Sequence, residues 1–436
     1  LPLKGALAIL FVLLQLVTFF IGKEKWQSKN LWLPILQCLP LTFIALSLLY
    51  SDDLFRGGKY LERSALILLL PWVFFINRNS ITKEVQTKTL RFFSAVVVLF
   101  VIYVFIRFAL TGRFIATLQL ANSYYYIRTY LASVAGMHPT YFSLVLGVGA
   151  IALQADLKKQ VKLDGIKVVL ALGLFIVIAG LVLASSKMMV IATLVSSAIV
   201  WSEAWSLKKI LKRVTVGLVL FAVLVVLVKP MRQRASEFYE ALAQSSISES
   251  NPDSMRKAIY KSGIAAIKEN VWLGTGIGDD QTALNQKYNE FGFTLALETK
   301  FNTHNNYLQV WLAAGLVPFI IFCALQIVQI LIGYLSRNFL HLAISTLFGL
   351  SMLTENILSR QDGIFMYAFF SSLLVYASWS NNKHLVFING RFTSQKTSGV
   401  QRFAQEITRN LLSQKGSFVL LVLKTSGLKP TKERAL

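Results

Sequence analysis

The sequence predicts an all-α polytopic membrane protein with about 11–12 transmembrane helices. Its 436 residues are 55% hydrophobic and only 15% charged, whereas average soluble domains carry roughly 25% charged residues. The apolar residues also form blocks long enough to cross a hydrocarbon core of about 30 Å, which takes roughly 20 residues of helix. Because backbone groups in lipid must be satisfied within the protein, we expect these blocks to be helices.

Eleven blocks are predicted to be membrane segments. They are residues 5–21, 31–50, 64–77, 91–110, 141–154, 167–184, 188–201, 214–228, 307–334, 340–358 and 364–380. Three of them, at 64–77, 141–154 and 188–201, are short and are expected to be half-helices or to extend into polar flanks. The chain begins with Leu1 rather than Met, so we expect a truncated start, with a twelfth helix if the natural N-terminus is cytoplasmic.

The charge pattern predicts which loops face the cytoplasm. The chain carries a net charge of +23, and its basic residues gather in alternate short loops, which the positive-inside rule places in the cytoplasm. These loops hold Lys23, Lys25 and Lys29; Arg78, Lys83 and Lys88; Lys158, Lys159, Lys162 and Lys167; and Lys208, Lys209, Lys212 and Arg213. The long, neutral loop at about 229–305 is then periplasmic, and the basic charge predicts topology rather than a nucleic-acid partner.

The long loop carries two recognisable patterns. Asn251 and Pro252 predict the start of a helix, and Met255, Ile259, Ser262 and Ala266 follow at the spacing of one helical face, ending near Asn270. The run Trp272–Gly278 then contains three glycines but lacks the Lys-Ser/Thr of a phosphate-binding loop. We interpret the run as a tight turn rather than a phosphate cradle.

Charged residues near membrane segments are candidates for function because they are costly to place there. The residues expected on the outer side are His138, Lys187, Arg256, His304, Glu355 and Arg360. One histidine base with several cations suits an anionic, phosphate-bearing substrate. Four of them also have a structural alternative: a helix cap for His138, snorkelling for Lys187, a solvated face for Arg256 and a buried hydrogen-bonding group for Glu355.

Other features point away from metal chemistry. Cys38 and Cys323 both lie within apolar blocks, which is typical of small buried hydrophobic residues rather than a disulfide or a metal pair. No metal-ligand motif of the CxxC or HExxH type occurs in the sequence. We therefore expect no metal and no cofactor.

The chain resembles the O-antigen ligase/polymerase superfamily over roughly residues 40–380. The resemblance rests on Arg256, the run Trp272–Gly278, and His304-Asn305-Asn306-Tyr307-Leu308 with Gly315. Glu355-Asn356 and Ser185-Ser186-Lys187 fit the same pattern. Residues 1–380 are accordingly expected to form the membrane domain, with a GT-C-like fold.

The resemblance implies the reaction and the roles of several residues. Members transfer glycan from an undecaprenyl-diphosphate-linked oligosaccharide to an acceptor glycan or lipid, on the periplasmic face of the bacterial inner membrane, as metal-independent inverting glycosyltransferases. His304 would be the general base and Arg256 would bind the donor diphosphate. Lys187 stands where the family often has arginine, and lysine supplies charge without a bidentate fork. His138, Glu355 and Arg360 are further substrate-binding candidates.

Residues 381–436 differ in character from the rest. Residues 385–389 and 417–423 predict strands and residues 399–412 an amphipathic helix. Val386–Phe392 with Thr397–Ala404 resembles the start of a family-4 glycosyltransferase of the GT-B fold. We expect a truncated, inactive soluble fragment, whose presence favours polymerase over ligase. A transporter or flippase of lipid-linked polysaccharide is the alternative function, but it would place charges along the centre of its helices.

Overall fold

Every regular element that the computed structural model describes in the membrane part of the chain is a helix. It describes residues 2–21, 31–111, 123–160, 164–184, 187–202, 207–227, 252–379, 386–389 and 418–421, with the single residues 232, 236, 239, 247, 402, 403 and 406. The first half contains α1 (Pro2–Ile21), α2 (Trp32–Leu46), η1 (Ser47–Tyr50), α3 (Leu54–Ile76), α4 (Lys83–Ala109), α6 (Ser123–Ala135), α7 (Pro139–Lys159), α8 (Gly165–Ala184), α9 (Lys187–Val200) and α10 (Leu207–Leu227).

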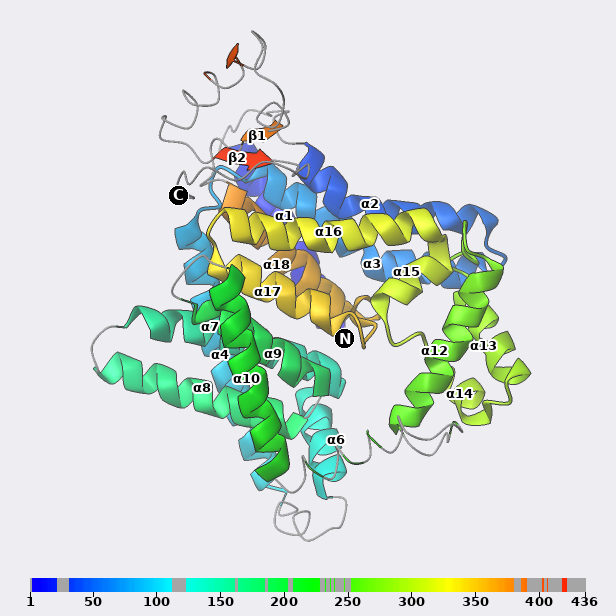
Figure 1. The fold of residues 1–436 in the computed structure, drawn as a ribbon, viewed down its shortest axis with the longest axis horizontal. Helices are drawn as coiled ribbons and strands as arrows, with labels where there is room; N and C mark the ends of the chain where they lie inside the picture. The colour runs from blue at the N-terminus through cyan, green and yellow to red at the C-terminus, as the bar shows by residue number, and fades with distance from the viewer. Residues whose placement is uncertain are drawn as a thin grey trace.

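The second half begins with the predicted long loop. It contains α12 (Pro252–Glu269), α13 (Asp280–Glu290), α14 (Thr294–Thr299), α15 (Asn306–Ala314), α16 (Leu316–Leu335), α17 (Phe339–Ser351), η2 (Ile357–Ser359) and α18 (Gln361–Trp379). Figure 1 shows α12, α13 and α14 grouped at one side of the molecule, beyond the ends of α15 and α17.

Five described helices are long and apolar enough to cross a membrane. These spans are Trp32–Tyr50, Lys83–Ala109, Pro139–Lys159, Gly165–Ala184 and Leu316–Leu335, and three shorter apolar stretches are Ala8–Ile21, Lys187–Val200 and Phe339–Ser351. The predicted all-helical membrane class is therefore confirmed. The number of 11–12 crossings stays a prediction.

The helix bounds correct the predicted segments in three places. Segment 307–334 is two helices, because Gly315 with φ +90° ends α15 and a Cβ there would lie 2.0 Å from the Trp272 carbonyl oxygen. Segment 340–358 ends as a helix at Ser351 and continues as a turn over residues 352–354, directly before Glu355. The helix α6 lies between two predicted segments and was not expected. The short segment predicted at 64–77 is part of α3, which begins at Leu54. It therefore extends into a polar flank, which is one of the two alternatives given for it above.

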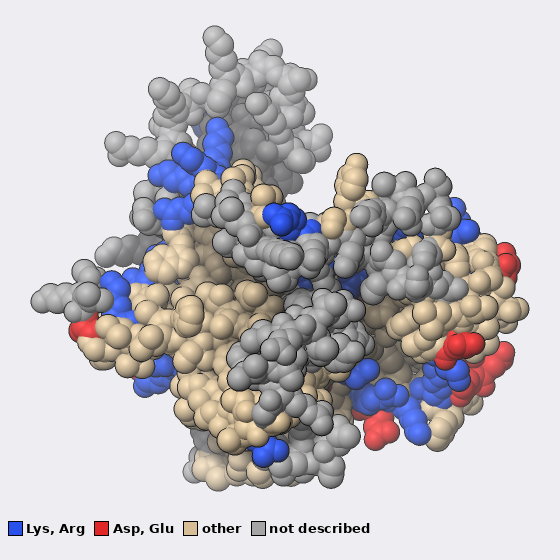
Figure 2. All heavy atoms as spheres, turned by 90° about the horizontal axis from the view of Figure 1, so that it is seen from below, with Lys and Arg blue, Asp and Glu red and all other residues tan. Residues whose placement is uncertain are grey.

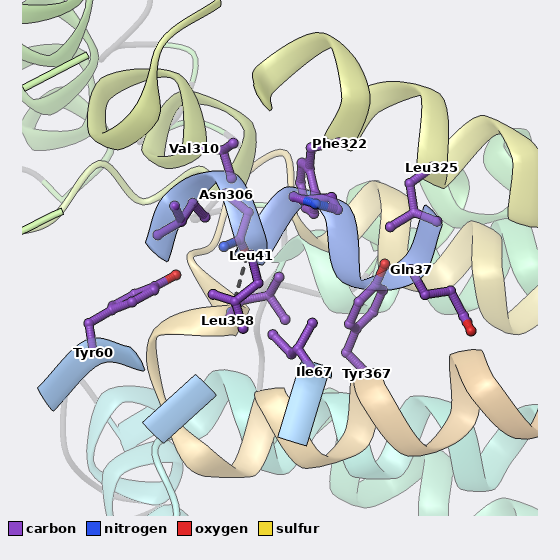
Figure 3. A pocket seen from close by; sticks show the side chains of 12 residues that line it. Gln37, Leu41, Tyr60, Ile67, Asn306, Val310, Phe322, Leu325, Leu358 and Tyr367 are labelled. Atoms are coloured by element: carbon purple, nitrogen blue, oxygen red, sulfur yellow. Dashed lines mark hydrogen bonds between the residues drawn. The ribbon is translucent and has the colours of Figure 1, made fainter. Parts of the chain in front are cut away.

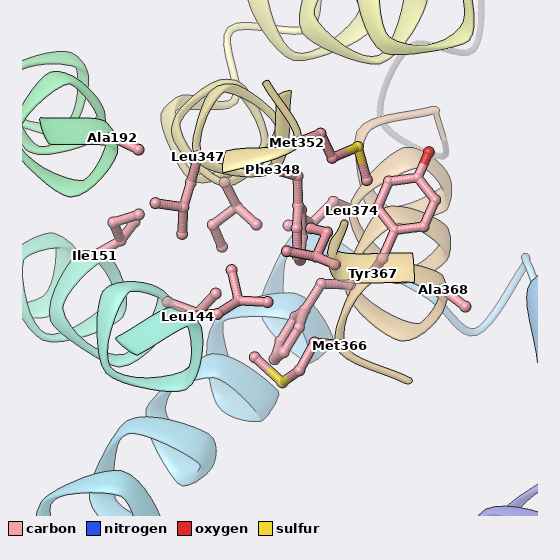
Figure 4. Close-up of a cluster of buried hydrophobic side chains, with 14 of the residues drawn as sticks. Leu144, Ile151, Ala192, Leu347, Phe348, Met352, Met366, Tyr367, Ala368 and Leu374 are labelled. Carbon is pink, nitrogen blue, oxygen red and sulfur yellow. The ribbon is translucent and has the colours of Figure 1, made fainter. Parts of the chain in front are cut away.

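The core forms where helices from both halves of the chain meet. Leu144 and Ile151 of α7, Leu347 of α17 and Leu374 of α18 are fully buried, and Figure 4 shows such side chains interdigitating between these helices. Glycines permit the closest contacts: a Cβ on Gly149 would lie 2.8 Å from Val97. This packing fixes the ends of α7, α17 and α18, which carry the candidate residues.

A small cavity lies inside the packing of α2, α3, α15, α16 and α18. Its volume of about 20 Å³ is enough for one water molecule. Gln37 lines it together with Asn306 and Tyr367 (Figure 3). This cavity is too small for a substrate, so the site must lie elsewhere.

The two predicted strands of the tail form a parallel pair. β1 (Val386–Asn389) pairs in register with β2 (Phe418–Leu421). Most of the predicted helix at 399–412 lies outside the described residues. The division into residues 1–380 and 381–436, and the glycosyltransferase-like origin of the tail, stay predictions.

Candidate active site

The helix α12 is held by its apolar face, as the sequence predicts. Met255, Ile259, Ser262 and Ala266 are all at most 5% exposed. They face a second apolar core, which includes Leu284, Tyr288, Phe293 and Leu312 from α13, the segment before α14, and α15. This core fixes α12 with its other side, which carries Arg256 and Tyr260, turned toward the end of α17.

The glycine run attaches this unit to the membrane helices. Thr275 and Gly276 donate their backbone N–H groups to the carbonyl oxygens of Leu312 and Ala313, at 2.7 and 3.0 Å. Ile277 and Gly278 donate theirs to Ser47 Oγ and Ser51 Oγ, each at 3.1 Å. Since these N–H groups bond within the protein, the run is the close-packed turn that was predicted and not a phosphate cradle.

Three segments converge at the end of α17. The Leu353 carbonyl oxygen accepts hydrogen bonds from Asn305 Nδ2 at 2.8 Å and from Tyr260 Oη at 3.3 Å. The Asn306 N–H donates to the Met352 carbonyl oxygen at 2.9 Å. The loop before α15, the helix α12 and the turn after α17 are thereby fixed against one another.

Glu355 is the centre of the cluster that these segments form. Arg256 Nη2 donates to Glu355 Oε1 at 3.0 Å. His304 Nδ1 lies 3.5 Å from Glu355 Oε2, which is within ion-pair range once the imidazole is protonated. Within the described residues Nδ1 has no hydrogen bond. The Glu355 side chain is 13% exposed, against 25% for His304 and 33% for Arg256.

The surroundings of Glu355 keep it ionised. Burial alone would raise the pKa of its carboxyl group, but His304, Arg256 and His138 outweigh that effect and lower the pKa below its ordinary value of 4.5. A carboxylate beside Nδ1 favours the tautomer with its proton on that nitrogen. That arrangement leaves Nε2 as the ring nitrogen that takes up a proton.

His304 is held in an uncommon backbone conformation. Its φ of +45° lies in the left-handed region, where non-glycine residues are uncommon and are enriched at functional sites. Its N–H donates to Asn302 Oδ1 at 3.0 Å, a side-chain turn that supports this conformation. The backbone of His304 is therefore held in a defined conformation at this site.

A buried amide network supports both sides of the cluster. Gln309 Oε1 accepts hydrogen bonds from Thr303 Oγ1 at 2.9 Å and Asn356 Nδ2 at 3.1 Å, while Asn306 Nδ2 donates to Asn356 Oδ1 at 2.6 Å. Gln309 Nε2 in turn donates to the buried carboxylate of Asp280. The neighbours of His304 and Glu355 are thus linked through a single set of side chains.

His138 lies near the cluster as a helix cap. Its Nδ1 accepts a hydrogen bond from the Thr140 N–H at 3.4 Å, at the start of α7. Burial lowers the pKa of His138 below 6.5; Glu355 opposes this shift, and Arg360 adds to it. A neutral ring that accepts at Nδ1 presents a donor at Nε2. The capping alternative is therefore confirmed, and its geometry does not favour His138 as a base.

The remaining candidates lie around this cluster. Arg360 is exposed, and its guanidinium carbon lies 6.0 Å from the centre of the Tyr141 ring. Lys187 is the first residue of α9 and is half-buried. Two residues later, Met189 Sδ accepts a hydrogen bond from Ser351 Oγ, at the end of α17. Lys187 thus begins α9 and Arg360 directly precedes α18, and the roles of both cations stay predictions.

Sequence reasoning missed two groups of residues at this site. Tyr260 follows Arg256 by one helical turn and contacts the same segment, as its spacing on α12 could have indicated. The amides of Gln309 and Asn356 are buried, and nothing in their sequence surroundings indicates that they meet.

The comparison with known families agrees with this geometry. Residues 172–323 match the O-antigen ligase family. This stretch of the chain is therefore similar to an O-antigen ligase family domain. Proteins of that family are enzymes of glycosyl transfer that act on lipid-linked glycans. No curated protein matches the chain.

The family region covers part of the cluster. Lys187, Arg256, the glycine run and His304 lie within residues 172–323, whereas His138, Glu355 and Arg360 lie outside them. The carboxylate of Glu355, which contacts Arg256 and His304, thus comes from beyond the matched residues. The structure supplies that relationship, since the matched region alone does not contain it.

Proposed function

We propose that this protein transfers glycan from an undecaprenyl-diphosphate-linked donor to an acceptor hydroxyl at the periplasmic face of the bacterial inner membrane. The acceptor is another glycan in a polymerase or a lipid in a ligase. The observation that supports this function is the cluster of Arg256, Glu355 and His304, which combines a cation, a base and an orienting carboxylate.

His304 is the general base in this proposal. The acceptor O–H loses its proton to His304 Nε2 as its oxygen forms a bond to the anomeric carbon. Glu355 stabilises the imidazolium that forms, since its Oε2 lies 3.5 Å from Nδ1. Attack from the face opposite the diphosphate inverts the anomeric configuration.

Arg256 receives the leaving group. The bond from the anomeric carbon to the diphosphate oxygen breaks, and its electron pair stays on the diphosphate. A guanidinium can form two parallel hydrogen bonds to a phosphate and so neutralise the developing charge. A diphosphate carries more negative charge than one carboxylate, so it would compete with Glu355 for Arg256. Lys187 and Arg360 supply further positive charge, and the chemistry requires no metal because the lipid diphosphate is already an activated leaving group.

The distribution of charge disfavours the transporter alternative. A pathway for an anionic glycan would place charges along the centre of the membrane helices. The spans Trp32–Tyr50 and Leu316–Leu335 contain no charged residue, and the charges of Pro139–Lys159 lie in its last turn. The described cations of the site instead lie at or beyond helix ends, where an enzyme that acts on a headgroup needs them.

Glycan analysis of a strain that lacks the gene tests this function. Short chains of one repeat on the carrier would identify a polymerase, and long chains that stay unattached would identify a ligase. Complementation with the intact chain should restore the normal glycan, whereas the His304→Asn variant should not. A deletion strain with normal glycans would refute the proposal.

A further inference from the structure

A groove opens between α16 and α17, which run side by side in Figure 1. Its volume is about 310 Å³, at the lower end of the range of roughly 300–1,000 Å³ for small-molecule pockets. The lining includes Tyr307, Cys323, Ile327, Ile330, Gly349 and Leu353. Since α16 is one of the five spans apolar enough to cross a membrane, the groove lies along the membrane part of the protein.

The groove offers a ligand few free polar groups, because the polar side chains that line it already form hydrogen bonds within the protein. Tyr307 Oη donates to the Gly349 carbonyl oxygen at 3.0 Å, and Thr346 Oγ1 donates to Leu342 at 2.7 Å. Gln326 Nε2 donates to Tyr367 Oη at 2.7 Å. The groove therefore suits a hydrocarbon chain and offers little to a polar ligand.

One end of the groove reaches the charged cluster. Leu353 lines the groove, and its carbonyl oxygen accepts the hydrogen bonds of Asn305 and Tyr260. Glu355 follows two residues later and pairs with Arg256. From Cys323 to Ile330 the groove extends along eight residues of α16, a rise of roughly 10 Å. The groove thus begins close to the ion pair of Arg256 and Glu355.

We propose that this groove holds the first isoprene units of the polyisoprenyl chain of the donor. The inference rests on the proposed function, in which Arg256 binds the diphosphate to which that chain is attached. A chain that leaves the cluster needs an apolar surface contiguous with it, and the groove provides one. Lipid tails are as apolar as leucine side chains, so the groove directs the chain and thereby orients the diphosphate, rather than adding much affinity.

Gly349 offers a matched pair of variants. A Cβ there would lie 3.7 Å from Tyr307 Oη, which is ordinary van der Waals contact, so Gly349→Ala fits. Gly349→Leu places a larger side chain into the groove. Thr346→Leu blocks it from a neighbouring position without touching the Tyr307 hydrogen bond, in case Gly349→Leu does not fold.

The experiment uses the full chain in nanodiscs and a prenyl diphosphate that carries a photoreactive benzophenone on its first isoprene units. We expect the label on peptides of α16 and α17 in the wild type and in Gly349→Ala. Gly349→Leu and Thr346→Leu should lose the label from these peptides while keeping the unfolding temperature. The readout requires no turnover, so labelling in the groove without glycan transfer would refute the proposed function and leave the groove assignment standing.

Three results would overturn the groove assignment. They are a label confined to other helices, no labelling at all, or equal labelling in folded Gly349→Leu and Thr346→Leu proteins. Equal labelling of the groove by a benzophenone phosphatidylethanolamine, with no competition by prenyl diphosphate, would show that an ordinary phospholipid occupies it instead.

Discussion

Arg256 and Glu355 form a hydrogen-bonded ion pair, with Arg256 Nη2 3.0 Å from Glu355 Oε1, although they are 99 residues apart in the sequence. The pair joins α12, in the predicted periplasmic loop, to the turn after α17. Glu355 also lies beside His304 Nδ1. The position of the cation therefore depends on the same carboxylate that orients the imidazole.

Removal of Arg256 should destabilise the protein through the carboxylate it leaves behind. Arg256→Ala is expected to cost roughly 1–3 kcal/mol, the penalty of an unsatisfied buried group, reduced by the one-third exposure of the Arg256 side chain. Adding Glu355→Gln should restore part of the loss, with a coupling energy of about 0.5–3 kcal/mol. Unfolding of the four proteins in detergent measures this cycle, and Lys268→Ala, on the exposed side of the same helix, is the control. Additive losses would show that the two residues act separately.

The sequence alone was sufficient to predict the fold class. The residue at the centre of the site, by contrast, could be identified only from the tertiary packing. Long apolar blocks predict helices because lipid leaves the backbone no other partner. The break at Gly315 was missed because both flanks are apolar, and only the approach of Trp272 explains it. His304 and Arg256 were predicted from local patterns. The role of Glu355 as their shared partner depends on contacts across the sequence, which no local pattern contains.

His138 should make the protein less stable in mild acid. Burial lowers the pKa of His138 below 6.5, so the unfolded chain binds this proton more readily than the folded chain does. His138 therefore leaves the free energy of unfolding unchanged above pH 6.5. Below pH 6.5 it lowers this free energy progressively, until the pH reaches the lowered pKa of His138 in the folded state. His138→Asn keeps a good helix cap and should flatten this part of the curve. Unfolding temperature against pH checks this, and identical curves for the two proteins would contradict it.

The predicted topology places α13 outside the cytoplasm. Gln286 is exposed on α13, whereas Lys287 and Tyr288 beside it are buried. Gln286→Cys should react with an impermeant maleimide in intact spheroplasts. Lys88→Cys, at an exposed position of α4 that is predicted to be cytoplasmic, should react only after lysis. The reverse pattern would invert the topology and place the cluster on the cytoplasmic side.

The tail should be dispensable for the reaction. The candidate residues all precede residues 381–436. Deleting residues 381–436 is expected to leave membrane insertion and glycan assembly unchanged, as measured by membrane protein level and by glycan analysis. Loss of glycan assembly in a deletion that inserts normally would assign the tail a working role.

The base role of His304 is the central claim, and transfer in proteoliposomes tests it most directly. His304→Asn removes the base and suits the left-handed backbone, which asparagine tolerates. Lys300→Asn is the matched control, since Lys300 also has a positive φ, of +53°, in the same loop. The account predicts that His304→Asn lowers turnover by about 10²–10⁴-fold, with normal unfolding and normal binding of the prenyl-diphosphate donor, while Lys300→Asn transfers glycan at the wild-type rate. Near-normal turnover by a stable His304→Asn protein would contradict the account.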